Sequence, residues 1–172
     1  MGILILVTGG VRSGKSSYAQ RIADSSGLKV FFIATAEELD GDMKKRIKAH
    51  KRSRPDGWVT IEEPFKLKNA LISLPSGKKA VIIDCLTLLI SNLIQKGRSD
   101  DQIINEIKAA LKAARAKAEV TVIVTNEVGS GIVPLNALSR RFRDLQGKIN
   151  QIAAKEADRV CLLVSGIPVQ VK

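Results

Sequence analysis

The chain has 172 residues, 45% of them hydrophobic and only 3% aromatic, a composition that suits one domain with an aliphatic core. No apolar run reaches the 18 residues that a membrane-spanning helix needs, so we expect no transmembrane segment. The formal net charge of +11 is typical of nucleic-acid-binding proteins, but four Phe, one Tyr and one Trp are too few for a base-stacking surface, which argues against that class.

The first predicted element is the apolar strand Ile3–Val7, which is followed by a glycine-rich turn and a helical stretch over Ser17–Ser25. The turn, residues 9–16, reads Gly-Gly-Val-Arg-Ser-Gly-Lys-Ser and has the Gly-x4-Gly-Lys-Ser spacing of phosphate-binding loops. Its glycines allow several backbone N–H groups to face one point, and a helix beginning near Lys15 adds the positive end of its dipole. The motif predicts that Lys15 reaches the β and γ phosphates of a nucleotide and that Ser16 ligates Mg²⁺. A glycine turn that matches by chance is the alternative, which the strand–turn–helix context disfavours.

Further apolar runs, several of them continuous rather than alternating, predict strands that are covered on both faces. They lie at Val30–Ala34, Ala80–Asp84, Val120–Thr125 and Arg159–Val164. Helices are predicted between strands, over Asp100–Ala118 with a capping box from Ser99 and Gln102, and over Gln146–Ala157. Residues 166–171 are consistent with a short final hairpin strand.

The alternation of strands and helices predicts an α/β fold with a mostly parallel sheet and helices on both faces. We expect residues 1–172 to form a single domain with an unusual insertion near residues 36–65. Because ligands bind at the carboxyl ends of the strands in such sheets, the residues directly after each strand are candidates for the site. Asp84 ends one strand and is placed to hold Mg²⁺, although a helix N-cap or turn aspartate is the alternative. Ala34, Thr35 and Ala36 allow close approach of a ligand, but a plain loop explains them equally well.

The most distinctive segment, Asp40–Arg54, contains seven Lys and Arg residues and the only histidine, His50. As a helix, it would align His50 with the apolar Leu39, Met43 and Ile47 along one side. A neutral imidazole can attack phosphorus, and neighbouring guanidinium groups can stabilise the charge that develops on the phosphates. A structural or merely exposed histidine is the alternative, and the segment taken alone favours it.

Other residues leave the choice of role open. Glu62, in the short strand and turn predicted at residues 58–64, suits a contact with a base or ribose and suits equally a salt bridge with the basic segment. Thr125-Asn126-Glu127 ends a strand, and Arg140, Arg141, Arg143 and Asp144 follow a glycine-containing loop; these residues suit a substrate site, a neighbouring subunit or solvent. Cys85 and Cys161 lie in apolar surroundings and are predicted to be buried free thiols, which makes a cytoplasmic location the expectation.

Several blocks occur together in order. They are Gly9-Gly10-x-Arg12-Ser13-Gly14-Lys15-Ser16, Ile33-Ala34-Thr35-Ala36, Arg46-Ile47-x-x-His50-x-x-x-Arg54-Pro55-x-x-Trp58-x-Thr60-x-Glu62, Asp84-Cys85-Leu86-Thr87, Thr125-Asn126-Glu127-Val128-Gly129-x-Gly131-x-Val133-Pro134 and Arg141-Phe142-Arg143-Asp144. Over nearly its whole length, the chain resembles the bifunctional adenosylcobinamide kinase/adenosylcobinamide-phosphate guanylyltransferase family of cobalamin biosynthesis. One departure is Leu89, where the family often carries tryptophan; we expect it to alter packing rather than chemistry.

The resemblance implies two reactions. ATP or GTP phosphorylates the aminopropanol hydroxyl of adenosylcobinamide, and a histidine, here His50, then carries GMP from GTP to the product and yields adenosyl-GDP-cobinamide. Lys15 is the second catalytic residue, with Mg²⁺ held by Ser16 and Asp84. The family's nucleotide contacts fall on Gly9, Gly10, Val11, Arg12, Ser13, Gly14, Lys15, Ser16, Ala34, Thr35, Ala36, Lys51, Arg52, Ser53, Arg54, Glu62 and Asp84. The resemblance also implies a homotrimer of RecA-like subunits whose partners are small molecules, with no nucleic acid and no membrane.

Two other functions remain as alternatives. A P-loop kinase for another small alcohol, with His50 structural, would leave no GMP on the protein after incubation with labelled GTP. A basic nucleic-acid-binding ATPase would bind oligonucleotides with a steep dependence on salt.

Overall fold

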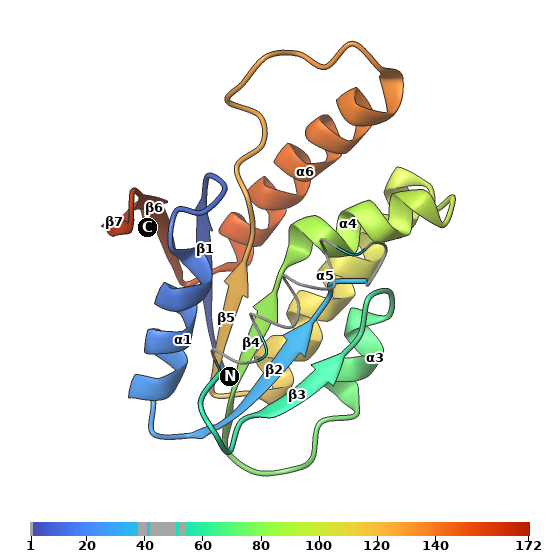
Figure 1. Cartoon of the computed structure of the whole chain (residues 1–172). Coiled ribbons are helices and arrows are strands. Elements are labelled where there is room, and N and C mark those ends of the chain that lie inside the picture. The colour runs from blue at the N-terminus through green and yellow to red at the C-terminus, as the bar shows by residue number, and fades with distance from the viewer. Residues whose placement is uncertain (1, 38–40, 42–50, 52–53) are drawn as a thin grey trace.

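The computed structural model describes residues 2–37, 41, 51 and 54–172, which contain a seven-stranded sheet of order β3-β2-β4-β5-β1-β6-β7 (Figure 1). All neighbouring strands pair in parallel except β7, which is antiparallel to β6. The strands are β1 Ile3–Gly9, β2 Lys29–Ala34, β3 Val59–Glu62, β4 Lys79–Asp84, β5 Val120–Val124, β6 Arg159–Val164 and β7 Ile167–Gln170. The predicted α/β class, its strands and the final hairpin are therefore confirmed.

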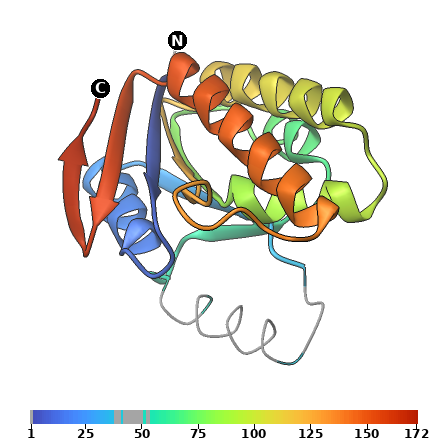
Figure 2. The same cartoon turned by 90° about the horizontal axis from the view of Figure 1, so that it is seen from above.

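Helices cover both faces of the sheet (Figure 2). They are α1 Lys15–Ser25, α3 Leu67–Ile72, α4 Leu86–Gln95, α5 Asp100–Lys117 and α6 Ala137–Glu156. Successive strand residues point to opposite faces: Leu4 and Leu6 belong to the core under α3 to α6, whereas Ile5 and Val7 pack with α1. Burial on both faces explains why the strands read as continuous apolar runs.

The sequence analysis gave no range for α3 or α4, and the range predicted for α6 is too short. This helix begins at Ala137 rather than at the predicted Gln146, because the Asn136 side chain caps its first turn by accepting a hydrogen bond from the Ser139 N–H at 2.7 Å. The capping box at the start of α5 is confirmed, since Ser99 and Gln102 bond each other's backbone N–H groups. The helix predicted over Asp40–Arg54 lies outside the described residues except at Gly41, Lys51 and Arg54.

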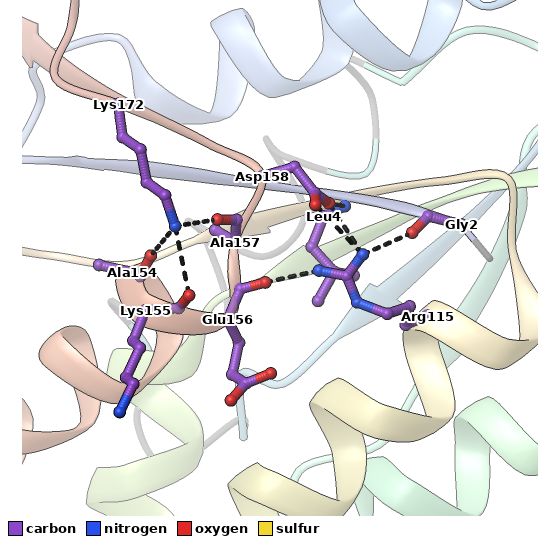
Figure 3. A network of polar contacts seen from close by, with 9 residues as sticks. All are labelled: Gly2, Leu4, Arg115, Ala154, Lys155, Glu156, Ala157, Asp158 and Lys172. Carbon is purple, nitrogen blue, oxygen red and sulfur yellow. Dashed lines mark hydrogen bonds and ion pairs between the residues drawn. The ribbon is translucent and has the colours of Figure 1, made fainter.

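At the amino end of β1, side chains tie four segments of the chain together (Figure 3). Arg115 on α5 donates to the Gly2 carbonyl at 3.0 Å and pairs with Asp158, whose other contact is the Leu4 N–H at 2.7 Å. Lys172 donates to three carbonyls in the last turn of α6, at Ala154, Lys155 and Ala157. These bonds satisfy groups that a helix end leaves unpaired and fix the edge of the sheet opposite to the phosphate loop.

Replacing Asp158 by asparagine is expected to lower Tm by roughly 2 °C at neutral pH, a loss that should shrink below about pH 4. The Leu4 N–H and then Arg115 hold the pKa of Asp158 below its ordinary value of about 3.9. A carboxylate with a lowered pKa contributes fully above the unfolded pKa and loses its contribution as the pH falls through the folded pKa. Thermal unfolding between pH 7 and pH 3 measures this, with the exposed Asp24→Asn as control; an equal Tm deficit throughout would contradict the assignment.

Candidate functional site

The phosphate loop occupies residues 9–14, between the end of β1 and the start of α1. Gly9 and Gly14 have φ values of 149° and 91°, and Gly14 is the N-cap of α1. A Cβ at Gly9 would lie 2.6 Å from the Leu163 carbonyl oxygen, so glycine is required there by space as well as by conformation. The predicted helix start at Lys15 is confirmed, and the helix N-terminus faces the loop.

Lys15 lies inside this loop with only 7% of its surface exposed. Its ammonium group donates to the Gly10 carbonyl and lies 3.4 Å from the Ser13 hydroxyl. Burial lowers the pKa of Lys15, while the nearby Cys85 and Asp84 oppose that shift. The cation is thus buried among loop oxygens, on the side of the loop that faces the end of β4.

The β6–β7 hairpin supports the loop from the other side, a contact that the sequence did not predict. Its two-residue turn, Ser165 and Gly166, has φ values of 50° and 87°, and the Gly166 N–H donates to the Ser13 carbonyl at 3.0 Å. A Cβ at Gly14 would lie 3.3 Å from the Gly166 Cα. The Ser165-Gly166 pair between two apolar runs indicates a hairpin turn in the sequence. It does not indicate that this turn packs against the phosphate loop.

The ends of β2 and β4 are joined by a buried threonine. The Thr35 hydroxyl donates to the Cys85 carbonyl at 2.7 Å and accepts from the Cys85 N–H at 2.8 Å. Ala34 is also buried, so Ala36 is the most exposed of the three small residues proposed to contact a ligand. The free thiol prediction is confirmed for both cysteines, and burial raises the pKa of Cys85 to about 12, with a further contribution from Asp84.

Asp84 ends β4 beside two basic side chains of the predicted site. Its charge acts on Lys15 and also on Arg54, whose pKa is lowered by burial and raised by Asp84 and Glu62. The Arg54 guanidinium lies 3.8 Å from the Phe32 ring centroid and donates to the Thr60 hydroxyl at 3.0 Å. The Arg54 Nε is buried without a hydrogen-bond partner in the part of the chain that the structure describes.

Glu62 forms an ion pair with Lys51. A salt bridge to the basic segment, one of the two roles left open for Glu62, is therefore present. His50, Arg52 and Ser53 lie outside the described residues. Among the described candidates, the structure brings together the phosphate loop, Asp84 and Arg54 at the carboxyl edge of the sheet, with Lys51 and Glu62 beside the end of β3.

The segment after β5 also reaches this edge. The Glu127 N–H donates to the Gly9 carbonyl at 3.1 Å, and the Glu127 carboxylate accepts from the Thr8 hydroxyl at 2.7 Å. The arginines that follow contact their own chain: Arg140 donates to the Pro134 and Leu135 carbonyls, and Arg141 pairs with Asp100. Of Glu127, Arg140 and Arg141, it is Glu127 whose hydrogen bonds reach the phosphate loop.

Relatives of this chain are evident in sequence. A family model described as cobinamide kinase / cobinamide phosphate guanyltransferase matches residues 5–171. The chain is 41% identical over 169 residues to the bifunctional adenosylcobalamin biosynthesis protein CobP of Pseudomonas aeruginosa, covering 97% of this chain and 96% of that protein. It is 40% identical over 183 residues to the bifunctional adenosylcobalamin biosynthesis protein CobU of Escherichia coli K12, covering 99% and 100%.

Solved structures support the fold alone, because their sequence identities are low. The flagellar accessory protein FlaH from Methanocaldococcus jannaschii superposes with a TM-score of 0.54 at 14% identity, over 99% of this chain and 78% of that one. The RadB recombinase gives a TM-score of 0.54 at 14% identity, over 94% and 74%. No helix among the described residues is long and apolar enough to cross a membrane. With the family match spanning nearly the whole chain and the phosphate loop formed, this protein belongs to the cobinamide kinase/cobinamide phosphate guanyltransferase family.

Proposed function

We propose that this protein catalyses two successive transfers to one corrinoid substrate. It first moves a phosphoryl group from ATP or GTP to the aminopropanol hydroxyl of adenosylcobinamide, and it then adds GMP from GTP to that phosphate. The product is adenosyl-GDP-cobinamide. The observation that carries the proposal is the buried Lys15 inside a glycine loop that caps α1, with Asp84 and Arg54 nearby, in a chain of this family.

In the first reaction, the loop N–H groups and Lys15 bind the triphosphate. When a phosphate oxygen replaces the Gly10 carbonyl as acceptor, the Lys15 ammonium group stays hydrogen-bonded. Its positive charge then lies against the phosphoryl group that is transferred. The nucleotide-binding residues we propose here are Gly9 to Ser16, Ala34 to Ala36 and Asp84.

A magnesium ion fits the donors present. The Ser16 hydroxyl and the Asp84 carboxylate are hard oxygen ligands, and Mg²⁺ is commonly bound by one or two protein oxygens together with substrate phosphates. Ser16 opens α1 directly after Lys15, and Asp84 acts electrostatically on Lys15, so both belong to the same edge of the sheet. We propose these two residues as the ligands; the ion would neutralise charge on the phosphates.

In the second reaction, a ring nitrogen of His50 attacks the α-phosphorus of GTP and pyrophosphate leaves, which forms a P–N bond to GMP. An oxygen of the cobinamide phosphate then attacks the same phosphorus, and the P–N bond breaks to restore the imidazole. We propose that Lys51 to Arg54 and Glu62 contact the nucleotide in this step. The Lys51–Glu62 pair and the Arg54–Phe32 contact hold described members of that set beside the end of β3.

We further propose that the protein acts as a homotrimer, with small molecules as its partners and without a nucleic acid or a membrane. Exposed apolar side chains in and after the loop that precedes α6 offer a surface for subunit contacts; they are Ile132, Leu135 and Leu138. Light scattering of the purified protein measures the assembly directly.

Incubation with GTP labelled at the α-phosphate tests the proposed function. We expect one labelled GMP per active subunit, stable in base and lost in acid, as a phosphoramidate should be. Adding adenosylcobinamide phosphate should discharge the label into adenosyl-GDP-cobinamide. A protein that phosphorylates adenosylcobinamide but never carries label would instead be a kinase without guanylyl transfer.

A further inference from the structure

The segment that follows β5 brings a carboxylate to the phosphate loop. The Thr125 N–H donates to the Val7 carbonyl at 3.0 Å, and the Glu127 N–H donates to the Gly9 carbonyl at 3.1 Å, so the chain beyond β5 continues alongside β1 into the loop. Glu127 thus lies beside the first glycine of the phosphate loop, at the edge where Lys15 and Asp84 lie. In Figure 1 this segment rises from the end of β5 beside the end of β1.

One oxygen of Glu127 is held by two side chains. Its Oε1 accepts from the Thr8 hydroxyl at 2.7 Å and from the Asn150 amide at 3.1 Å. The Glu127 side chain nevertheless belongs to an exposed residue. The Glu127 carboxylate is thus fixed through one oxygen at the edge of the sheet where the phosphate loop lies, in a residue that is exposed there.

The partner Asn150 is itself oriented by a buried polar cluster. Its Oδ1 accepts from the Thr125 hydroxyl at 2.7 Å and from the Gln146 amide at 2.8 Å, which leaves its Nδ2 to donate to Glu127 and to the Asn126 carbonyl. Gln146 also donates to the Thr125 hydroxyl at 2.9 Å, and both residues are fully buried. The Gln146 Oε1 is the one atom of this cluster that is buried without a hydrogen-bond partner among the described residues. Burying polar groups is costly unless they are bonded, so the bonds that Thr125, Gln146 and Asn150 make to one another hold the Asn150 amide in place beside Glu127.

Two other carboxylates lie at the end of β3, which β2, β4 and β5 separate from β1 in the sheet. Glu63 accepts from the Phe65 and Lys66 N–H groups, and Glu62 pairs with Lys51. Asp84 is assigned to the metal in the proposed function. The phosphorylation of an alcohol still needs a group that orients the hydroxyl and accepts its proton.

We propose that Glu127 is that group, a further catalytic residue for the kinase reaction; this inference rests on the proposed function. The free oxygen of Glu127 accepts the proton of the aminopropanol hydroxyl as the hydroxyl oxygen bonds to the γ-phosphorus. The bond from that phosphorus to the nucleoside diphosphate breaks, and Glu127 then releases the proton to water. Thr8 and Asn150 are positioning residues for Glu127.

The test is Glu127→Gln, which keeps an oxygen for Thr8 and Asn150 but is not a base. Phosphorylation of adenosylcobinamide should lose about 10²-fold or more in kcat with an unchanged nucleotide KM. Guanylylation assayed separately, with GTP and adenosylcobinamide phosphate, should remain near the wild-type rate. The matched control is Glu63→Gln, a carboxamide at the same sheet edge, which should leave both reactions unchanged.

Three outcomes would overturn the inference. They are a wild-type kinase rate in Glu127→Gln, an equal fall of both reactions, and a raised nucleotide KM that accounts for the whole loss; the last two would make Glu127 a support of the loop only. If the wild-type protein itself forms no adenosylcobinamide phosphate, the proposed function fails, and this inference fails with it.

Discussion

Replacing Lys15 by alanine is expected to lower kcat for phosphorylation of adenosylcobinamide by at least about 100-fold. The ammonium group is the one described cation whose side chain donates to the phosphate loop itself, through the Gly10 carbonyl. Charge spreads over the oxygens of the transferred phosphoryl group in the transition state, so a fixed positive charge at that point stabilises the transition state directly. Steady-state kinetics with saturating nucleotide measure the effect on kcat.

A second variant separates the charge of Lys15 from its packing. Lys15→Met retains an unbranched apolar stem inside the loop but lacks the ammonium group, so it should lose as much kinase activity as the alanine variant. Its Tm should not fall, because a cation whose pKa is lowered by burial contributes an unfavourable desolvation term that methionine removes. Lys78→Ala, an exposed lysine at the opposite edge of the sheet, is the charge-matched control. Normal kinase turnover in either Lys15 variant would remove the loop from the mechanism.

The strands were predictable because each one is buried on both faces. Leu4 and Ile5 are both apolar, but for separate reasons. Leu4 packs under α5 and α6, whereas Ile5 packs under α1. The phosphate loop was predictable for a local reason: its φ values, its cap and its lysine all belong to eight consecutive residues. The residues that define such a pattern also form the structure that it predicts, so the pattern can be recognised without knowledge of the rest of the fold.

Features that depend on contacts distant in sequence were not predictable. The first half of α6 contains Arg140 and Arg141, which bond to loop carbonyls and to Asp100. Phe142 nevertheless packs against the core, so the apolar spacing that leads to Leu145 was present in the sequence and was missed. The support of the phosphate loop by Gly166 and the fixing of Glu127 by Asn150 join segments that spacing alone does not bring together. The sequence pointed to Thr125-Asn126-Glu127 as a strand end but gave no reason to choose between substrate, subunit and solvent.

Replacing His50 by alanine is expected to abolish the GMP-protein intermediate and to lower guanylyl transfer by about 10⁴-fold or more, as removal of a nucleophile does in other enzymes. Phosphorylation of adenosylcobinamide should continue, because Lys15 and Ser16 are unchanged. The two reactions therefore separate in one variant, and α-labelled GTP together with a coupled kinase assay measures both. GMP transfer at the wild-type rate in His50→Ala would overturn the assignment.

Exogenous imidazole sharpens this test. In His50→Gly, the lost side chain leaves room for a free imidazole, whose ring nitrogen can attack the α-phosphorus of GTP, expel pyrophosphate and pass GMP to adenosylcobinamide phosphate. Recovery of guanylyl transfer that saturates with imidazole concentration would identify the missing group as a nucleophile rather than a structural side chain. As a control, imidazole in the same buffer should not restore the kinase activity of Lys15→Met. A structural histidine predicts the opposite pattern, in which stability falls and added imidazole restores nothing. Because the reaction with free imidazole uses the same bound nucleotide, its rate also tests the proposed contacts of Lys51, Arg54 and Glu62 with GTP.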